Sequence, residues 1–225
     1  MAERVLVEGP TGTGKTTSLR NLDPKQTFIN QVTAKGLPFR GWRKDYTYWD
    51  AVKNPDGNLL VRDTSEDICN VMRYVNGNMP HVKNLVIDDA QFVMVKEMFA
   101  RSQEKGYDKF TDMAQHASEM LTMPDTLRHD LNVIFMWHTE LDDGVYCAKT
   151  CGKMLKEKMQ PETLFTYVVM TKILRQKEGE CKHVFVVKSD GTSTVKTPMG
   201  MFDEMYIDND LQVLLNNIKK YNEGE

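Results

Sequence analysis

An octapeptide near the amino terminus constrains the fold more than any other part of the chain. Residues Gly9 to Thr16, called the glycine loop below, read GPTGTGKT and match the pattern GxxxxGK[ST] in full, one residue after the apolar run Val5 to Val7. A glycine-rich loop between a buried strand and a helix start turns successive backbone N–H groups toward one point, where an anion gains hydrogen bonds and the helix dipole. The segment therefore predicts a strand, a phosphate-binding loop and a helix, with a nucleoside triphosphate as ligand.

Each residue of the glycine loop has an expected role. Gly9, Gly12 and Gly14 permit positive φ and a close approach of the backbone to phosphate. We expect Lys15 to reach the β and γ phosphates, and the hydroxyl of Thr16 to bind Mg²⁺. The other residues expected to contact the nucleotide are Pro10, Thr11, Thr13 and Thr17.

Apolar runs alternate with helical periodicity through the first two thirds of the chain. Beyond the first strand, we expect strands over residues 27–30, 58–62, 84–90 and 132–140, and helices over 17–22, 65–77, 91–103 and 109–130. Near-continuous apolar strands that alternate with helices predict an α/β fold, with a mostly parallel sheet covered by helices on both faces. A length of 225 residues, of which 40% are hydrophobic, suits a single domain over 1–225.

Two regions depart from this alternation. Residues 35–57 are rich in aromatic and charged residues without steady periodicity, and predict an irregular insertion. In the last third, β-rich runs at 165–174 and 184–188 predict antiparallel strands added at the sheet edge. A further short strand is expected at 192–196, and a terminal amphipathic helix at 209–221.

Polar residues at strand ends are the candidates for chemistry. Asp88 follows the apolar residues Leu85 to Ile87 and is placed to hold the Mg²⁺ shell through water. Asp89 is a candidate base that orients the attacking water, or alternatively a cap of the next helix. His138 ends an apolar strand and is a candidate γ-phosphate sensor, or alternatively a core histidine. Other carboxylates that would position water, if the fold brings them near, are Asp50, Asp63 and Glu66.

A long connector follows His138. Residues 141–161, called the lysine segment below, are expected to form a mobile loop that binds a phosphate backbone in a nucleotide-dependent way. Its DNA-binding candidates are Lys149, Lys153, Lys156 and Lys158. A solvated loop is the alternative, because acidic residues partly offset these lysines. Lys196 follows a short β-rich run and is a candidate to complete the γ-phosphate site of its own or a neighbouring subunit, or else a plain edge-strand lysine.

Composition narrows the partners. The formal net charge of −3 provides no global basic field, so any contact with nucleic acid must come from a local patch. No apolar run approaches the length of a membrane span, and we expect a cytoplasmic protein that does not contact membranes. Free thiols are the expectation for the cysteines. A zinc site at nonstandard spacing is the alternative, with Cys147, Cys151, Cys181 and His183 as its ligands.

With these motifs in order, the chain resembles the RecA-like P-loop ATPases, and most closely the small phage-encoded members of that group that act as single-strand annealing recombinases. The resemblance covers most of the chain. It rests on GPTGTGKTT at 9–17, LVIDDA at 85–90, VIFMWHTE at 133–140, GK at 152–153 and VKTPMGMF at 195–202.

The resemblance implies ATP and Mg²⁺ as ligands, ATP hydrolysis and binding of single-stranded DNA. It also implies assembly into a homo-oligomeric ring or filament, a possible single-strand-binding protein as partner, and the host cytoplasm as location for a phage-encoded chain. Two features depart from the family pattern: its water-activating glutamate has no clear match, and no second basic residue follows Lys196 in the finger element. Weak or conditional hydrolysis is the corresponding expectation.

Two other functions use the same loop. A small-molecule or nucleotide kinase is one, although no arginine for a lid stands between Arg128 and Arg175. A non-hydrolysing, ATP-gated interaction module is the other. No guanine-reading NKxD element is found in the sequence, which favours ATP over GTP.

Overall fold

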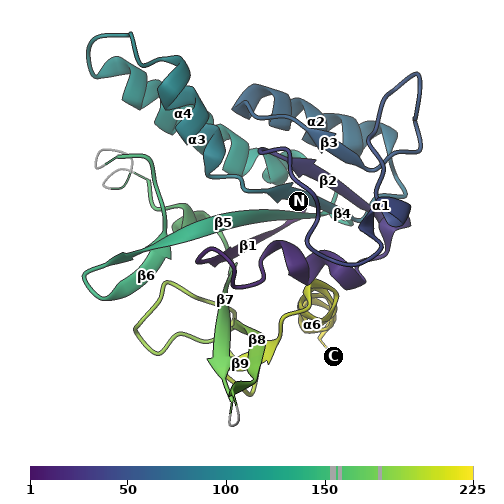
Figure 1. Ribbon diagram of the computed structural model, residues 1–225, viewed down its shortest axis with the longest axis vertical. Coiled ribbons are helices and arrows are strands. Elements are labelled where there is room, and N and C mark those ends of the chain that lie inside the picture. The colour runs from purple at the N-terminus through teal and green to yellow at the C-terminus, as the bar shows by residue number, and fades with distance from the viewer. Residues whose placement is uncertain (153–155, 157–158, 177–178, 225) are drawn as a thin grey trace.

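A computed structural model of the protein describes residues 1–152, 156, 159–176 and 179–224. Within these residues, nine strands form one sheet in the order β3-β2-β4-β5-β1-β7-β8-β9, and β6 pairs with β5 off this path (Figure 1). The strands are β1 (Glu3–Gly9), β2 (Thr27–Gln31), β3 (Leu59–Val61), β4 (Asn84–Asp88), β5 (Asn132–Asp142), β6 (Val145–Ala148), β7 (Tyr167–Arg175), β8 (Cys181–Val186) and β9 (Tyr206–Asp208). The six strands from β3 to β7 in this order are all parallel.

Helices cover both faces of the sheet, as the sequence predicts. On one face lie α2 (Ser65–Asn78), α3 (Phe92–Ala100) and α4 (Asp108–Thr122), and on the other lie the 3-10 helix η1 (Thr16–Asn21) and α6 (Leu211–Glu223) (Figure 1). The short helices are η2 (Pro24–Gln26), α1 (Trp42–Asp45), η3 (Met123–Thr126) and η4 (Pro161–Leu164). Among the described residues, no helix combines the length and the apolarity that crossing a bilayer would require.

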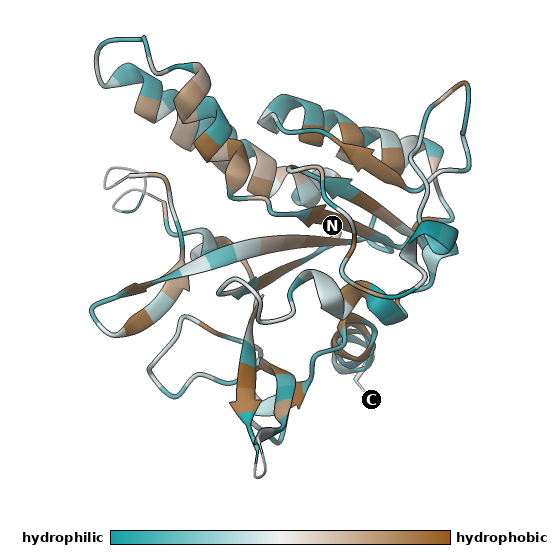
Figure 2. Cartoon of the chain, in the orientation of Figure 1, coloured by the Kyte–Doolittle hydropathy of each residue, from teal (hydrophilic) through white to brown (hydrophobic). Residues whose placement is uncertain are grey.

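The alternation of side chains along β1 explains the two layers. Leu6 packs in the core beneath α2 and α4, whereas Val5 and Val7 pack with Leu19 of η1 and with α6. Successive side chains of a strand point to opposite faces, so a strand that is apolar at every position must be covered twice. Figure 2 shows that β5 is strongly apolar where the helices cover it and becomes more polar where it extends beyond them.

Several elements differ from their predictions. The helix after the glycine loop is only the 3-10 helix η1, although Leu19 and Leu22 are buried under the sheet as expected. The helices predicted over 91–103 and 109–130 end earlier than expected, because α3 stops at Ala100 and Pro124 stands in η3 after α4. Residues 35–57 are irregular as predicted, with α1 and isolated bridges as their described regular structure.

The carboxyl-terminal strands also differ from their predictions. Strand β7 runs parallel to β1, so the predicted antiparallel addition begins only with β8 and β9. Residues 192–196 form two isolated bridges instead of a strand, because Ser193 and Lys196 pair with residues of different strands. Strand β9 was not predicted, since its three residues carry too little pattern to mark a strand.

The lysine segment begins as a hairpin and not as a loop. Strand β5 runs on to Asp142, and β6 pairs back onto it in antiparallel register. Asp143 and Gly144 both have positive φ, at 47° and 85°, which is the backbone of a tight two-residue hairpin turn. Residues 153–155 and 157–158 lie outside the described residues.

Candidate functional site

Three adjacent parallel strands bring the predicted residues to one edge of the sheet. Strand β5 lies between β1 and β4, and in their registers Gly9 stands opposite His138. Asp88 ends β4 on the other side of β5. Ligands of open parallel sheets bind beyond the carboxyl ends of strands, where chain connections diverge to opposite sides. From β1 the chain crosses to β2 on one side, and after β5 and β6 it passes to β7 on the other side. This edge of the sheet therefore meets that condition.

The glycine loop has the backbone that its sequence predicts. Gly9, Gly12 and Gly14 have φ values of 154°, 80° and 107°. A Cβ atom on Gly9 would lie 2.1 Å from Oγ1 of Thr171, which no real contact allows. The hydroxyl of Thr13 donates to the carbonyl of Pro10 at 2.7 Å and closes the loop on itself. The loop therefore requires glycine at Gly9 for space and at Gly12 for backbone conformation.

Lys15 lies inside the curve of the glycine loop. Its Nζ donates to the carbonyl oxygens of Gly9 at 2.7 Å and Pro10 at 3.0 Å, and lies 3.5 Å from Nδ1 of His138. Burial lowers the pKa of Lys15 to about 8. Two neutral carbonyls are weak partners for a buried ammonium, and phosphate oxygens would be stronger ones.

Asp88 is fully buried beneath Thr16. The hydroxyl of Thr16 donates to Oδ1 of Asp88 at 3.0 Å, whereas Oδ2 has no hydrogen-bond partner among the described residues. Burial raises the pKa of Asp88 above its usual range. A hydroxyl and a carboxylate are the hard oxygen ligands that Mg²⁺ prefers, and a cation would satisfy the orphaned oxygen. Both residues fit the predicted magnesium site.

Asp89 is held in a conformation that non-glycine residues rarely adopt, with φ of 61°. Its Oδ2 accepts a hydrogen bond from Nζ of Lys35 at 2.5 Å, and its Oδ1 lies 3.4 Å from Nε2 of His138. Burial would raise the pKa of Asp89, but these two partners outweigh it and bring the pKa to about 2. The alternative that Asp89 caps a helix is wrong, because α3 begins after Gln91 without a side-chain cap.

His138 faces the glycine loop. Its Nδ1 lies 3.3 Å from the hydroxyl of Thr11 and 3.5 Å from Lys15, while Nε2 faces Asp89. A core histidine would instead be surrounded by apolar side chains and a carbonyl. The side chain of His138 therefore lies between the glycine loop and Asp89, which follows β4.

Three neighbours of the site were not predicted. Lys35 comes from the irregular insertion, where no motif marks it. Gln31 ends β2 opposite Asp88, and both polar atoms of its buried amide have no partner among the described residues. Oε1 of Gln91 accepts a hydrogen bond from the backbone N–H of His138. Gln31 directly follows the predicted strand 27–30, and this place at a strand end was a usable signal for it.

Two predictions for lysines are changed by the structure. Lys196 is exposed, and its backbone pairs with Val168, which stands opposite Leu6 in the middle of β1. It is therefore displaced from the glycine loop of its own chain, and only the neighbouring-subunit role stays a prediction. Lys156 pairs with Glu140 at 3.1 Å and Asp142 at 2.9 Å, so its charge is compensated.

Of the other lysine candidates, the structure describes Lys149 alone. Lys149 is exposed, and its backbone N–H donates to the carbonyl of His138 at 2.8 Å. Lys153 and Lys158 lie outside the described residues.

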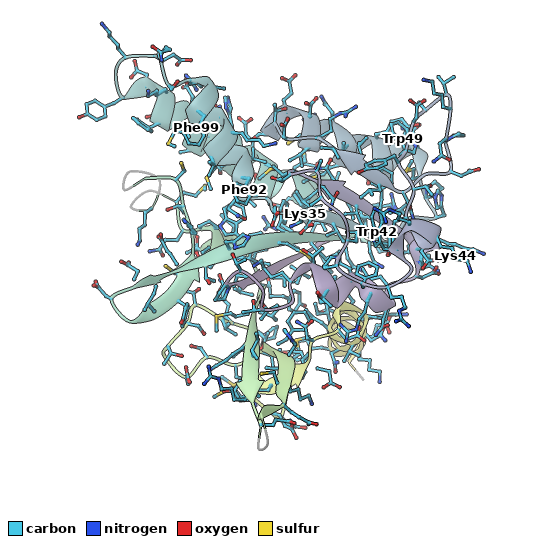
Figure 3. The ribbon with its side chains drawn as sticks, in the orientation of Figure 1. Lys35, Trp42, Lys44, Trp49, Phe92 and Phe99 are labelled. Atoms are coloured by element: carbon cyan, nitrogen blue, oxygen red, sulfur yellow. The ribbon has the colours of Figure 1, made fainter. Side chains whose placement is uncertain are left out.

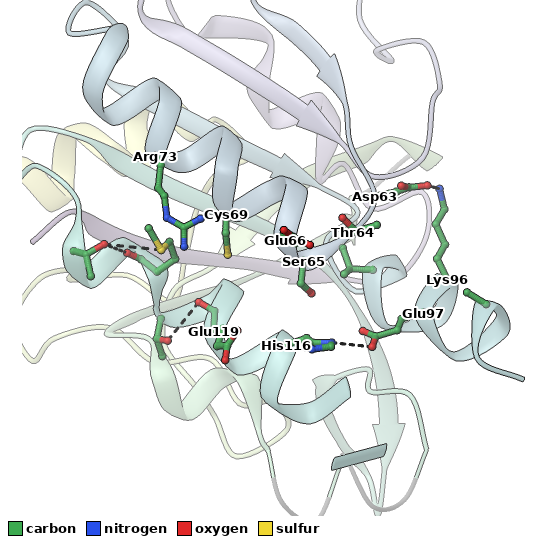
Figure 4. A pocket seen from close by; sticks show the side chains of 15 residues that line it. Asp63, Thr64, Ser65, Glu66, Cys69, Arg73, Lys96, Glu97, His116 and Glu119 are labelled. Carbon is green, nitrogen blue, oxygen red and sulfur yellow. Dashed lines mark hydrogen bonds and ion pairs between the residues drawn. The ribbon is translucent and has the colours of Figure 1, made fainter. Parts of the chain in front are cut away.

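The remaining carboxylates point elsewhere. Asp50 accepts hydrogen bonds from backbone N–H groups of its own exposed turn. Asp63 pairs with Lys96 at 2.8 Å and, with Glu66, lines a groove of about 960 Å³ between α2, α3 and α4 (Figure 4). None of the three is bonded to the glycine loop in the part of the chain that the structure describes.

The zinc alternative is not supported. Sγ of Cys151 lies 3.2 Å from Sδ of Met98, while Nδ1 of His183 lies 2.9 Å from the carbonyl of Thr13, on separate elements. All four cysteines are free. Across the described residues, no group of three or more His, Cys, Asp and Glu side chains is arranged to hold a metal ion.

The buried carboxyl groups of Glu8 in β1 and Glu162 in η4 both contact Thr194, and Glu162 also contacts the lysine segment. Oγ1 of Thr194 lies 3.1 Å from Oε1 of Glu8 and 3.0 Å from Oε1 of Glu162, which also accepts from the N–H of Ala148. One hydroxyl has one proton to donate, so one of the two carboxyls must carry a proton to complete the pair. Burial first, and then the charge of Glu162, raise the pKa of Glu8 to about 8. Glu8 is therefore the protonated member at neutral pH.

Comparison with protein-family models gave no match to this chain, and neither did a search of curated proteins.

The Glu8 carboxyl predicts a specific dependence of stability on pH. Unfolded Glu8 loses its proton near pH 4.5, whereas folded Glu8 keeps it to about pH 8. The free energy of unfolding should therefore fall as the pH rises through this window, by up to about 1.4 kcal/mol per pH unit. Glu8→Gln stays neutral, and should flatten the decline of melting temperature between about pH 5.5 and about pH 8.5. Equal slopes for Glu8→Gln, wild type and the exposed control Glu204→Gln would contradict this assignment.

The two glycines of the loop should differ in their tolerance of alanine. A Cβ at Gly9 meets Thr171 as well as an unfavourable φ, whereas a Cβ at Gly12 has no atom of the described residues within 4 Å and meets only the unfavourable φ. We expect Gly9→Ala to lower the free energy of unfolding by about 2 kcal/mol more than Gly12→Ala, because overpacking adds to backbone strain. Urea unfolding of both variants measures the difference. Equal losses would mean that Thr171 moves aside freely.

Proposed function

We propose that this protein is a RecA-like P-loop ATPase that binds ATP with Mg²⁺ and couples its nucleotide state to the binding and annealing of single-stranded DNA. One observation carries the proposal. Lys15, the Thr16–Asp88 pair and the His138–Asp89 pair converge on the glycine loop from the carboxyl ends of three adjacent strands. A glycine-rich turn that matched the pattern by chance would not be expected to have these side chains around it.

The chemistry of each group suits nucleotide binding. Backbone N–H groups of Gly12 to Thr16 and the ammonium of Lys15 would hold the β and γ phosphates. Thr16 and Asp88 would hold Mg²⁺, which when bound supplies charge neutralisation at the phosphate oxygens. The low pKa of Asp89 keeps this carboxylate ionised, so that it orients a water molecule better than it removes a proton. Slow hydrolysis is the consequence.

The link to DNA is supported by the backbone of β5 and β6. His138 faces the glycine loop through its side chain, and its carbonyl accepts from the N–H of Lys149 in the lysine segment. A displacement of His138 by a phosphate would therefore be transmitted to Lys149 through one hydrogen bond. A lysine-bearing segment bonded to His138 in this way suits a phosphate backbone as its ligand.

The proposal also includes assembly of the chain into a homo-oligomer. The exposed position of Lys196, away from its own glycine loop, suits a lysine that acts on a neighbouring subunit. A homo-oligomer in the cytoplasm, with a single-strand-binding protein as a partner, follows from the family resemblance.

ATPase turnover with and without single-stranded DNA tests this function, together with the mass of the particle in a non-hydrolysable ATP analogue. We expect stimulation by DNA and assembly that depends on nucleotide. Lys15→Ala should abolish turnover, while Lys25→Ala, an exposed lysine outside the site, should preserve it. Turnover only with a small phosphate acceptor would instead identify a kinase, and binding without turnover would identify an interaction module.

Nucleotide binding should take up a proton near pH 8. Lys15 is half deprotonated there in the free protein, and phosphates favour its charged form. The affinity for the ATP analogue should therefore fall above pH 8, by up to about tenfold per pH unit. Calorimetry in two buffers of different ionisation enthalpy measures the proton uptake. Binding of equal strength at about pH 7 and about pH 9.5, without proton uptake, would contradict the role of Lys15.

A further inference from the structure

Lys35 lies against both aspartates of the candidate site. Its Nζ is 2.5 Å from Oδ2 of Asp89 and 3.6 Å from Oδ2 of Asp88, the oxygen without a hydrogen-bond partner among the described residues. The side chain of Lys35 is 37% exposed, whereas that of Asp88 is 0% exposed. Figure 3 shows Lys35 among the strand ends and Lys44 at the periphery of the molecule. Lys35 therefore stands between the buried carboxylate and solvent.

The chain around Lys35 is anchored on both sides. The N–H of Val32 donates to the carbonyl of Asp88, and the carbonyl of Val32 accepts from Nζ of Lys96, which also pairs with Asp63. Leu37 is buried in the core on the face of the sheet that η1 and α6 cover. With both flanks fixed, the position of the ammonium is set by the fold.

With Asp88 and Asp89 ionised and Lys15 and Lys35 protonated, the charges of these four side chains sum to zero without any ligand. Burial pulls the pKa of Lys35 down, but the two carboxylates outweigh it and raise the pKa above its usual value. A divalent cation alone would add two uncompensated positive charges to a buried place, which is costly. Mg²⁺ with a triphosphate adds about −2 in total, and both lysines then become favourable.

We propose that Lys35 is a tethered cation that takes the place of the divalent ion at Asp88 and Asp89, so that the site accepts Mg²⁺ only together with a nucleotide. This inference rests on the proposed function of the site. When Mg²⁺ and a triphosphate enter, the ammonium gives up Asp88 and is available to the phosphates. Lys35 is thus a positioning residue that opposes binding of the metal alone and favours binding of the metal with nucleotide.

Lys35→Met tests the proposal, because it keeps an unbranched side chain of similar length and removes its charge. Two affinities are measured: that for Mn²⁺ without nucleotide, by electron paramagnetic resonance, and that for a non-hydrolysable ATP analogue with Mg²⁺, by calorimetry. We expect the first to rise and the second to fall, each by about tenfold or more, because a unit charge near 4 Å interacts strongly in a partly buried site. Lys44→Met, which alters an exposed lysine outside the site, should leave both affinities unchanged.

The opposite directions of the two changes separate this role from a structural one, which would weaken both affinities together. Adding Asp88→Asn to Lys35→Met should remove the gain in Mn²⁺ affinity and so place the ion at Asp88. An unchanged or weaker Mn²⁺ affinity in Lys35→Met would overturn the proposal. Lys35→Gln provides the same readout should the methionine variant not fold.

Failure of the proposed function would be recognised separately. If wild type and Lys15→Ala bind the ATP analogue equally poorly, the ATPase assignment is overturned. The gain in Mn²⁺ affinity needs no nucleotide, and would still support Lys35 as the counter-ion of Asp88 and Asp89.

Discussion

The hydrogen bond from Thr16 to the buried carboxylate of Asp88 ties the glycine loop to the end of β4. The two residues stand 72 positions apart, and the fold brings them together because β5 alone separates β1 from β4. Every other polar contact of the site is arranged around this connection. Lys15 and His138 lie on the β1 side of it, and Lys35 and Gln31 lie on the β2 side.

Burying a charged side chain is costly unless a group of opposite charge lies beside it. Asp88 is fully buried and Asp89 nearly so, and the compensating cations come from two loops, the glycine loop and the insertion after β2. The insertion after β2 is irregular in backbone. With Val32 and Leu37 fixed on either side, it positions Lys35 beside Asp88 and Asp89.

Local pattern was enough to predict Asp88, which ends β4, and His138, which ends the apolar part of β5 although the strand runs on to Asp142. Both follow apolar runs of parallel strands, so their convergence on the glycine loop could be expected. Lys35 could not be found in this way, because its position depends on long-range contacts that leave no periodic signal. The same reason explains β9 and the course of β7, whose partners are set by tertiary packing. The hairpin of β5 and β6 was missed although Asp143 and Gly144 form a suitable turn.

The proposed function requires that the phosphates of a nucleotide lie in the glycine loop. Hydrogen exchange of the backbone amides from Gly12 to Thr16 tests this claim directly, with and without Mg²⁺ and a non-hydrolysable ATP analogue. These N–H groups are the donors that the phosphates would engage, so their exchange should slow markedly when the analogue binds, while exchange in the distant α2 stays unchanged. Binding of the analogue with unaltered exchange across Gly12 to Thr16 would contradict the account.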